Sequence, residues 1–175
     1  MGCNQNIPYI LVLLTLPIQF SFHAEYLPSQ MYKMLQEWNS SKITNQQLEL
    51  ANELMSPFAI ISSILSIFLF YWVKRRIPII SIAYFIAGIV WLLYLAVNED
   101  RFWLAILLRC FNGLLLGIFQ MINISYILHF SVPKNSGFYG YLIQTMMFAG
   151  LGIINLFSAF LSWKTVAILL AITSF

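Results

Sequence analysis

The sequence FWLAILLRCFNGLLLGIFQMINISYILHF, residues 102–130, is a long and almost unbroken apolar run. It contains no proline, and its only charged residue is Arg109. A transmembrane helix needs about 20 mainly apolar residues, whereas the strands of a membrane barrel alternate between apolar and polar residues in period two. The run does not alternate, so it predicts a membrane-spanning helix.

Similar apolar runs lie on both sides of this stretch. The chain has 175 residues, of which 61% are hydrophobic and 9% are charged, against roughly 25% charged residues in ordinary soluble domains. This composition argues against a soluble monomer and leaves no room for a large soluble catalytic domain. We predict an all-α polytopic membrane protein that forms one bundle over residues 1–175. Its five transmembrane helices and the start of a sixth are expected at about residues 7–26, 51–73, 79–97, 102–130, 137–162 and 165–175.

The sequence offers little chemistry outside these runs. The net charge is +3 and no long basic cluster occurs, which argues against nucleic acid as a partner. Cys3 and Cys110 provide neither a disulfide framework nor a metal-ligand spacing. No nucleophile–base set and no nucleotide-binding loop is found in the sequence. We therefore expect an integral membrane protein in the lipid bilayer that is not an enzyme and holds no metal or cofactor.

The charged residues predict the orientation in the membrane. The cytoplasmic loops of membrane proteins are rich in Lys and Arg. With a cytoplasmic N-terminus, the short inner loops hold Lys74, Arg75, Arg76 and Lys134, and all 6 acidic residues lie on the outer side. Asn39, in the triplet Asn-Ser-Ser, is then a glycosylation acceptor in the long polar outer loop. We expect this orientation, in the plasma membrane.

Polar residues line one face of three predicted spans. On a helical wheel, each set falls within an arc of roughly 60–100°, and the third span has no such stripe, so we expect it to face lipid. Three polar faces predict a shared wet cavity, with Arg109 in a functional or gating role. The alternative is hydrogen bonding between helices, with Gly113 and Gly117 as a close-packing pair. The stripes are Arg109, Asn112, Gly113, Gln120 and Asn123; Gly137, Gly140, Gln144, Asn155, Ser158 and Ser162; and Thr15, Gln19 and His23.

Residues 107–163 resemble helices four and five of the sugar porter family, which includes the facilitative glucose transporters and belongs to the major facilitator superfamily. The family patterns are G-R-x-x-x-G-x-x-x-G, Y-x-S-E-x-x-P, R-G-x-x-G-x-x-x-Q and W-R. Residues 18–23, IQFSFH, resemble the start of the family's first helix, and Lys74, Arg75 and Arg76 resemble its basic loop between helices two and three. The matching residues are Arg109, Gly113, Gly117, Tyr126, Pro133, Gly137, Gly140, Gln144, Gly150 and Trp163.

The resemblance implies the N-terminal half of a twelve-helix carrier, in which sugar binds between two six-helix halves at mid-membrane. It assigns sugar hydroxyls to Gln144, whose amide both donates and accepts hydrogen bonds, and places Phe20 near the sugar. It also implies that the glycines of helices four and five, namely Gly113, Gly117, Gly137 and Gly140, mediate helix packing. The expected partners are a small-molecule sugar and a second half-transporter or a second copy of the chain.

Several family charges are missing from this chain. Tyr71 stands where the family has a loop acid, His129 where it has the Glu that ends helix four, and Ser136 where it has the Arg that opens helix five. The charged latch on the inner side is therefore expected to be weak or absent. His23 stands where proton symporters have an Asp, and a His beside Arg109 is expected to stay neutral and not to act as its counter-ion.

These departures favour facilitative uniport of a hexose-like sugar over proton symport. In the predicted polar network, Arg109 and His23 act together with Gln19 and Asn123. The alternative is a truncated, transport-inactive membrane protein with a structural or interaction role.

Overall fold

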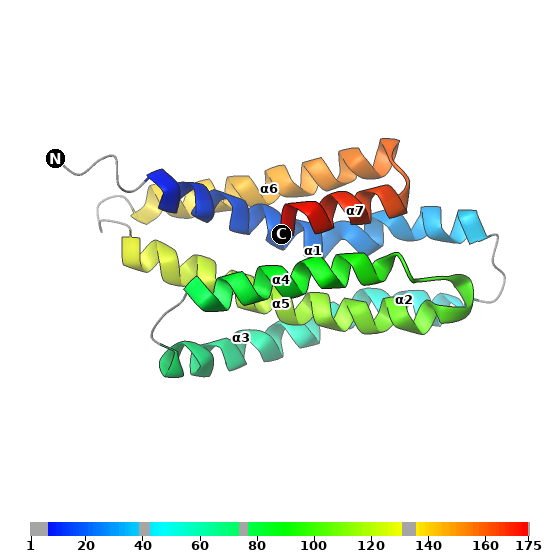
Figure 1. The fold of residues 1–175 in the computed structure, drawn as a ribbon, viewed down its shortest axis with the longest axis horizontal. Helices are drawn as coiled ribbons and strands as arrows, with labels where there is room; N and C mark the ends of the chain where they lie inside the picture. Colours follow the sequence, from blue (N-terminus) through cyan, green and yellow to red (C-terminus); the bar gives the residue numbers. More distant parts are fainter. Residues whose placement is uncertain (1–6, 39–42, 74–76, 131–135, 175) are drawn as a thin grey trace.

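The computed structural model describes residues 7–38, 43–73, 77–130 and 136–174, and these residues form helices and no strand. Figure 1 shows an elongated bundle of long helices that lie side by side. The helices are α1 (Ile7–Trp38), α2 (Asn45–Glu53), α3 (Met55–Trp72), α4 (Ile77–Tyr94), the 3₁₀ turn η1 (Glu99–Arg101), α5 (Phe102–Phe130), α6 (Ser136–Phe160) and α7 (Trp163–Ser174).

The first helix is much longer than the predicted span of 7–26. Helix α1 has 32 residues and contains Pro17 and Pro28 within it, which corresponds to a length of about 48 Å. The stretch 28–50, expected to be a polar loop, is therefore largely helical. Helix α2 also lies partly in this stretch, and it begins at a capping box in which Thr44 and Gln47 bond each other's backbone N–H groups.

Three helices in the described part of the chain are long and apolar enough to cross a membrane, at Gln46–Trp72, Glu99–Ile122 and Gly137–Phe160. Pro78–Tyr94 and Trp163–Ser174 are shorter apolar helices. The outer surface agrees with a lipid environment, because α3 exposes an apolar face that includes Ile60, Ile64 and Phe68. These features indicate a membrane-embedded protein.

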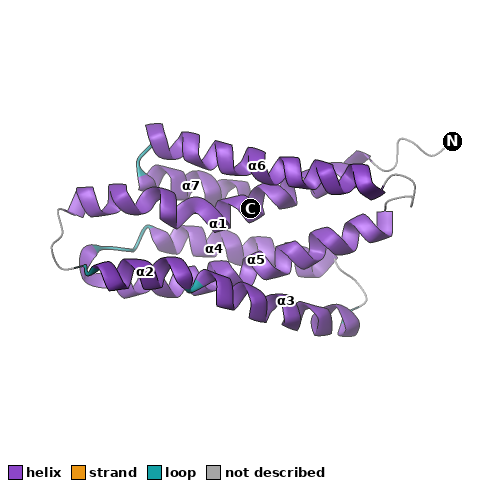
Figure 2. Ribbon diagram, turned by 180° about the vertical axis from the view of Figure 1, so that it is seen from behind, coloured by secondary structure: helices purple, strands orange, loops and turns teal. Residues whose placement is uncertain are grey.

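The helices that pack together are mostly not neighbours in the sequence. Helix α1 packs against α5, α6 and α7, helix α5 packs against α1, α3 and α4, and α4 packs against α7. Helices α1, α4 and α6 run in one direction along the bundle, and α3, α5 and α7 run back (Figure 1). Seen from behind, α6 and α3 lie at opposite edges (Figure 2).

The larger of these contacts fit an inverted repeat of two three-helix units. Exchanging α1 with α5, α3 with α6 and α4 with α7 converts the α1–α6 contact into the α5–α3 contact and the α4–α5 contact into the α7–α1 contact. The α1–α5 and α4–α7 contacts map onto themselves. Helices α1, α3 and α4 run opposite to α5, α6 and α7, respectively, so the two units have opposite directions (Figure 1).

Glycines allow the closest helix contacts. A Cβ at Gly117 would overlap Ser62 and Ala59 of α3, and one at Gly113 would lie 2.5 Å from the carbonyl oxygen of Met55. Helix α6 approaches α1 in the same way, since a Cβ at Gly150 would lie 2.8 Å from the Cβ of Ser21. Small residues at such crossings let two backbones approach in a membrane.

Candidate functional site

Arg109 of α5 is buried in the bundle and binds the backbone of α1. Its side chain is 2% exposed, and its two terminal nitrogens donate hydrogen bonds of 2.9 Å to the carbonyl oxygens of His23 and Ala24. In a regular helix the Ala24 carbonyl accepts the N–H of residue 28, but residue 28 is proline and has no N–H. The guanidinium therefore occupies the place of the missing donor.

The side chain of His23 links the same two helices. Its Nδ1 lies 3.0 Å from Oδ1 of Asn112, and the Asn112 amide donates to the hydroxyl of Tyr94 at 3.2 Å. The imidazole stacks on Trp91 with ring centroids 4.6 Å apart. His23, Asn112 and Tyr94 are fully buried, so this network joins α1, α4 and α5 in the interior.

Three nitrogens in this network have no hydrogen-bond partner among the described residues. They are Nε2 of His23, Nε of Arg109 and Nε1 of Trp91. The network combines the guanidinium of Arg109 with the imidazole of His23, the amide of Asn112 and the hydroxyl of Tyr94. The guanidinium donates to carbonyl oxygens, as intramembrane charges often do, and the nearby carboxylate of Glu25 also attracts it electrostatically.

A second polar contact joins α1 to α6 and α7. Gln30 donates to the hydroxyl of Ser158 at 2.5 Å, and the Ser158 hydroxyl lies 2.9 Å from that of Ser29. The hydroxyl of Tyr26 donates to the carbonyl of Trp163 at 2.9 Å. These bonds are of the kind that holds membrane helices together, so this cluster is structural.

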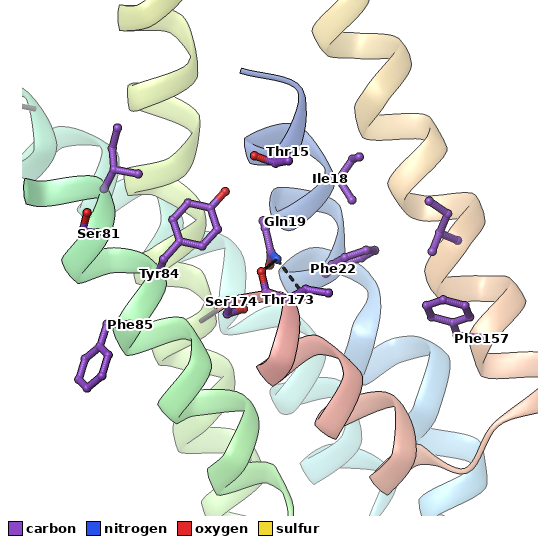
Figure 3. Close-up of a pocket in the computed structure, with 12 residues that line it drawn as sticks. Thr15, Ile18, Gln19, Phe22, Ser81, Tyr84, Phe85, Phe157, Thr173 and Ser174 are labelled. Carbon is purple, nitrogen blue, oxygen red and sulfur yellow. Dashed lines mark hydrogen bonds between the residues drawn. The ribbon is translucent and has the colours of Figure 1, made fainter. Parts of the chain in front are cut away.

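A cavity of about 720 Å³ lies between α1, α4, α6 and α7. Gln19 of α1 lines it and donates from Nε2 to the carbonyl oxygen and the hydroxyl of Thr173, both at 3.2 Å. Figure 3 shows Tyr84 of α4 facing Thr15 and Gln19 of α1 across this space. The size is within the range of small-molecule sites. The lining residues are Thr15, Ile18, Gln19, Phe22, Ile80, Ser81, Tyr84, Phe85, Ile153, Phe157, Thr173 and Ser174.

The structure brings only part of the predicted site together. His23 and Asn112 meet as the two stripes predicted, but Gln120 is exposed and Gln19 bonds α7. The third span does not only face lipid, because one side of α4 contributes Trp91 to the buried network. Phe20 is half-buried. The polar faces therefore do not open into one shared cavity.

The predicted stripe on α6 faces away from the interior over most of its length. Gln144 and Asn155 are exposed, whereas Ser158 is buried. Gly137 and Gly140 are also exposed, and an added Cβ at either position would meet no described atom within 4 Å. The helix packing expected of these two glycines therefore has no counterpart in the described bundle.

Several predicted residues lie outside the part of the chain that the structure describes in full. Asn39 and the basic loop Lys74, Arg75 and Arg76 are not described, and the side chains of Asn123 and His129 are not described within α5.

Three residues of the interior were not predicted from the sequence. Trp91, Tyr94 and Gln30 are fully buried and contact polar partners. Trp91 and Tyr94 lie in an apolar run, where an aromatic residue usually indicates packing. Gln30 lies after Pro28, in the stretch expected to be a loop. Only a prediction that α1 continues past Pro28 would have revealed it.

The described residues hold no group of three or more His, Cys, Asp or Glu side chains that could bind a metal ion. Comparisons of the chain with protein families, curated proteins and solved structures find no match.

Proposed function

We propose that this chain is one helical bundle of a facilitative carrier for a hexose-like sugar. The observation that carries the proposal is the inverted repeat of helix contacts, in which α1, α3 and α4 exchange with α5, α6 and α7. Transporter folds are commonly built from such repeats, with the substrate bound at their interface near mid-membrane. The sugar porter motifs in residues 107–163 agree with this architecture.

In this proposal the chain crosses the plasma membrane five times and begins a sixth crossing, with its N-terminus in the cytoplasm. The five spans are the three long apolar helices together with α1 and the shorter α4. Helix α7 begins the sixth crossing. The basic residues of the short loops support this orientation.

Gln144 is the proposed sugar contact. Its amide lies on the exposed side of α6 and makes no side-chain hydrogen bond within the described chain. An amide can donate to one sugar hydroxyl and accept from another. A second bundle opposite this side of α6, from another half-transporter or a second copy, would enclose the sugar, with Phe20 as an apolar contact.

The buried network favours uniport over proton symport. Arg109 pairs with two backbone carbonyls, and His23 pairs with Asn112. Neither hydrogen-bonded contact contains a carboxylate, and Glu25 interacts with Arg109 electrostatically without accepting either of its two bonds. We therefore assign Arg109 and His23 to the framework that positions α1 against α5 and not to proton coupling.

Hexose uptake into reconstituted vesicles tests the proposal. We expect uptake above that of protein-free vesicles, and a strong loss in Gln144→Ala. Thr145→Ala is the matched control, because Thr145 is exposed on the same helix and donates its hydroxyl to the Tyr141 carbonyl at 2.9 Å. Uptake that Gln144→Ala leaves unchanged would refute the site, and uptake equal to protein-free vesicles would refute the carrier.

The second candidate function is a transport-inactive membrane protein with a structural or interaction role. The observation in its favour is that Gln144 is separated from the polar interior, because it lies on the outer side of α6. A well-folded protein without uptake, which still associates with membrane partners, would support this alternative.

A further inference from the structure

Helix α6 carries two exposed side-chain amides among mostly apolar exposed residues such as Phe138, Phe148 and Leu156. Gln144 and Asn155 are exposed, and neither makes a side-chain hydrogen bond to another described residue. They are eleven residues apart, which places them about 16 Å apart along the helix and within about 20° of each other around it. On the same side of the helix, Phe148 lies between the two amides and Gly137 lies two turns before Gln144. We call Gly137, Gln144, Phe148 and Asn155 the amide face.

The opposite edge of the bundle shows that the fold itself does not require such a face. Helix α3 occupies the position equivalent to α6 under the exchange of repeats, and it lies at the other edge (Figure 2). Its exposed side holds large apolar residues such as Ile60, Ile64 and Phe68. Lipid can cover that side of α3, whereas an amide exposed to lipid lacks hydrogen-bond partners. The amide face therefore needs a polar partner that α3 does not need.

We propose that the amide face binds the same face of a second copy of this chain. Amides donate and accept, so each can pair with its own counterpart across a twofold axis. Two copies inserted in the same direction are related by an axis along the membrane normal, which sets the two α6 helices parallel. Gln144 then meets Gln144 of the other copy, and Asn155 meets Asn155.

Charge and shape agree with this occupant. The sequence of α6 contains no Asp, Glu, Lys or Arg, so two identical faces do not repel each other. No described atom lies within 4 Å of a Cβ built at Gly137 or Gly152, and these positions leave room for a close approach of the second helix. Phe148, which is 62% exposed, would be covered between the copies. In the paired state Gln144 bonds its counterpart and not a sugar, so the pairing is a sugar-free arrangement of the face that the proposed function assigns to sugar.

Energy transfer between labelled copies in lipid vesicles tests the proposal. Donor- and acceptor-labelled full-length chains are mixed and diluted with lipid, without sugar. We expect transfer above the level of random proximity, and an association constant roughly tenfold lower in the double variant Gln144→Leu, Asn155→Leu, because each interhelical amide bond contributes modestly. Thr145→Ala, on the neighbouring side of α6, should associate as the unaltered chain does.

Oxidative cross-linking places the contact. In a background with Cys3→Ala and Cys110→Ala, we expect Phe148→Cys to form a disulfide-linked dimer on addition of a copper oxidant, and Ile64→Cys on α3 to remain monomeric. Both positions are exposed, so neither change should prevent folding, and thermal unfolding checks this. Transfer at the level of random proximity, an unchanged association in the double variant, or cross-linking at Ile64 instead of Phe148 would overturn the proposal.

Discussion

The contact between Arg109 and α1 predicts that the effect of an arginine mutation depends on Pro28. In Arg109→Met, the Ala24 carbonyl loses its donor, and Pro28 has no N–H to replace it. In Pro28→Ala the backbone N–H is restored, and the carbonyl regains a helical partner. The two substitutions should therefore be strongly coupled, although the residues lie on different helices.

The expected change in the free energy of unfolding follows from the two hydrogen bonds of Arg109. Hydrogen bonds to charged groups contribute about 1.5–3 kcal/mol each, and Arg109 makes two of them to backbone carbonyls. Part of this gain is offset because the guanidinium no longer has to be buried. We expect Arg109→Met to lower the free energy of unfolding by about 2–3 kcal/mol. With Pro28→Ala the cost should fall by about 1–3 kcal/mol, which is the penalty of one buried unsatisfied carbonyl.

Unfolding in mixed micelles measures this coupling. Titration with a denaturing detergent, followed by tryptophan fluorescence, gives the free energy of unfolding for the four chains of the double-mutant cycle. The emission of the five tryptophans changes on unfolding, and it includes that of Trp91, which is fully buried beside His23. Arg101→Met, at an exposed position, should change the free energy little.

Equal costs in both backgrounds would refute the reasoning. If Arg109→Met destabilises the chain with Pro28 and the chain with Pro28→Ala by the same amount within about 0.5 kcal/mol, then Arg109 does not substitute for the missing N–H. Arg109→Lys gives a further check. An ammonium is a compact point charge and lacks the planar fork that bridges two carbonyls, so this variant should lie between Arg109→Met and the unaltered chain.

Three further predictions concern packing, pH and the cavity. Gly117→Ala should lower the free energy of unfolding by about 1–3 kcal/mol because its Cβ would overlap α3, whereas Gly140→Ala should cause no loss; equal losses would contradict this. The ion pair with Lys164 (3.0 Å) lowers the pKa of Glu37, beyond the apolar part of α1. This exposed pair contributes about 0.2–1 kcal/mol to stability. The contribution is present above the pKa that Glu37 has in the unfolded chain, and it is lost as the pH falls through the lower pKa of Glu37 in the folded chain. The difference in thermal unfolding between Glu37→Gln and the unaltered chain should therefore be present at pH 7 and shrink as the pH falls below the ordinary pKa of a glutamate. Gln19→Leu removes the amide bonded to the end of α7 and should accelerate amide hydrogen exchange there; unchanged exchange would exclude a capping role.

Hydropathy predicted where most helices lie, because a helix in contact with lipid needs apolar side chains, and these are visible directly in the sequence. The predicted span of 102–130 has the same bounds as α5. The first span was predicted to end twelve residues too early, since α1 ends at Trp38 and not at Tyr26. Pro28 and the polar residues after it indicate a break. The helix continues, and Arg109 supplies the donor that Pro28 lacks, a compensation that comes from another helix and cannot be read locally.

The candidate site was harder to predict than the helices. A helical wheel identifies the polar side of each helix but not the element that covers it. Two of the stripes do meet, at the bond between His23 and Asn112. The stripe on α6 has the same appearance in the sequence, yet Gln144 is on the outside. Helix α6 contacts α1 on the side of Gly150 instead. A search for polar residues in the sequence does not detect a helix contact made at a glycine.

The order in which the helices pack has a consequence for synthesis on the ribosome. Apart from α4 with α5, the main contacts join helices that are far apart in the sequence, such as α3 with α5 and α1 with α6. When α3 has just entered the membrane, its partner has not yet been translated. Helix α1 must wait even longer, until α5, α6 and α7 emerge. Contacts between distant segments form slowly and leave surfaces exposed in the meantime. The growing chain therefore carries unpaired membrane helices for most of its translation, and α1 is the helix whose polar side stays uncovered for the longest time.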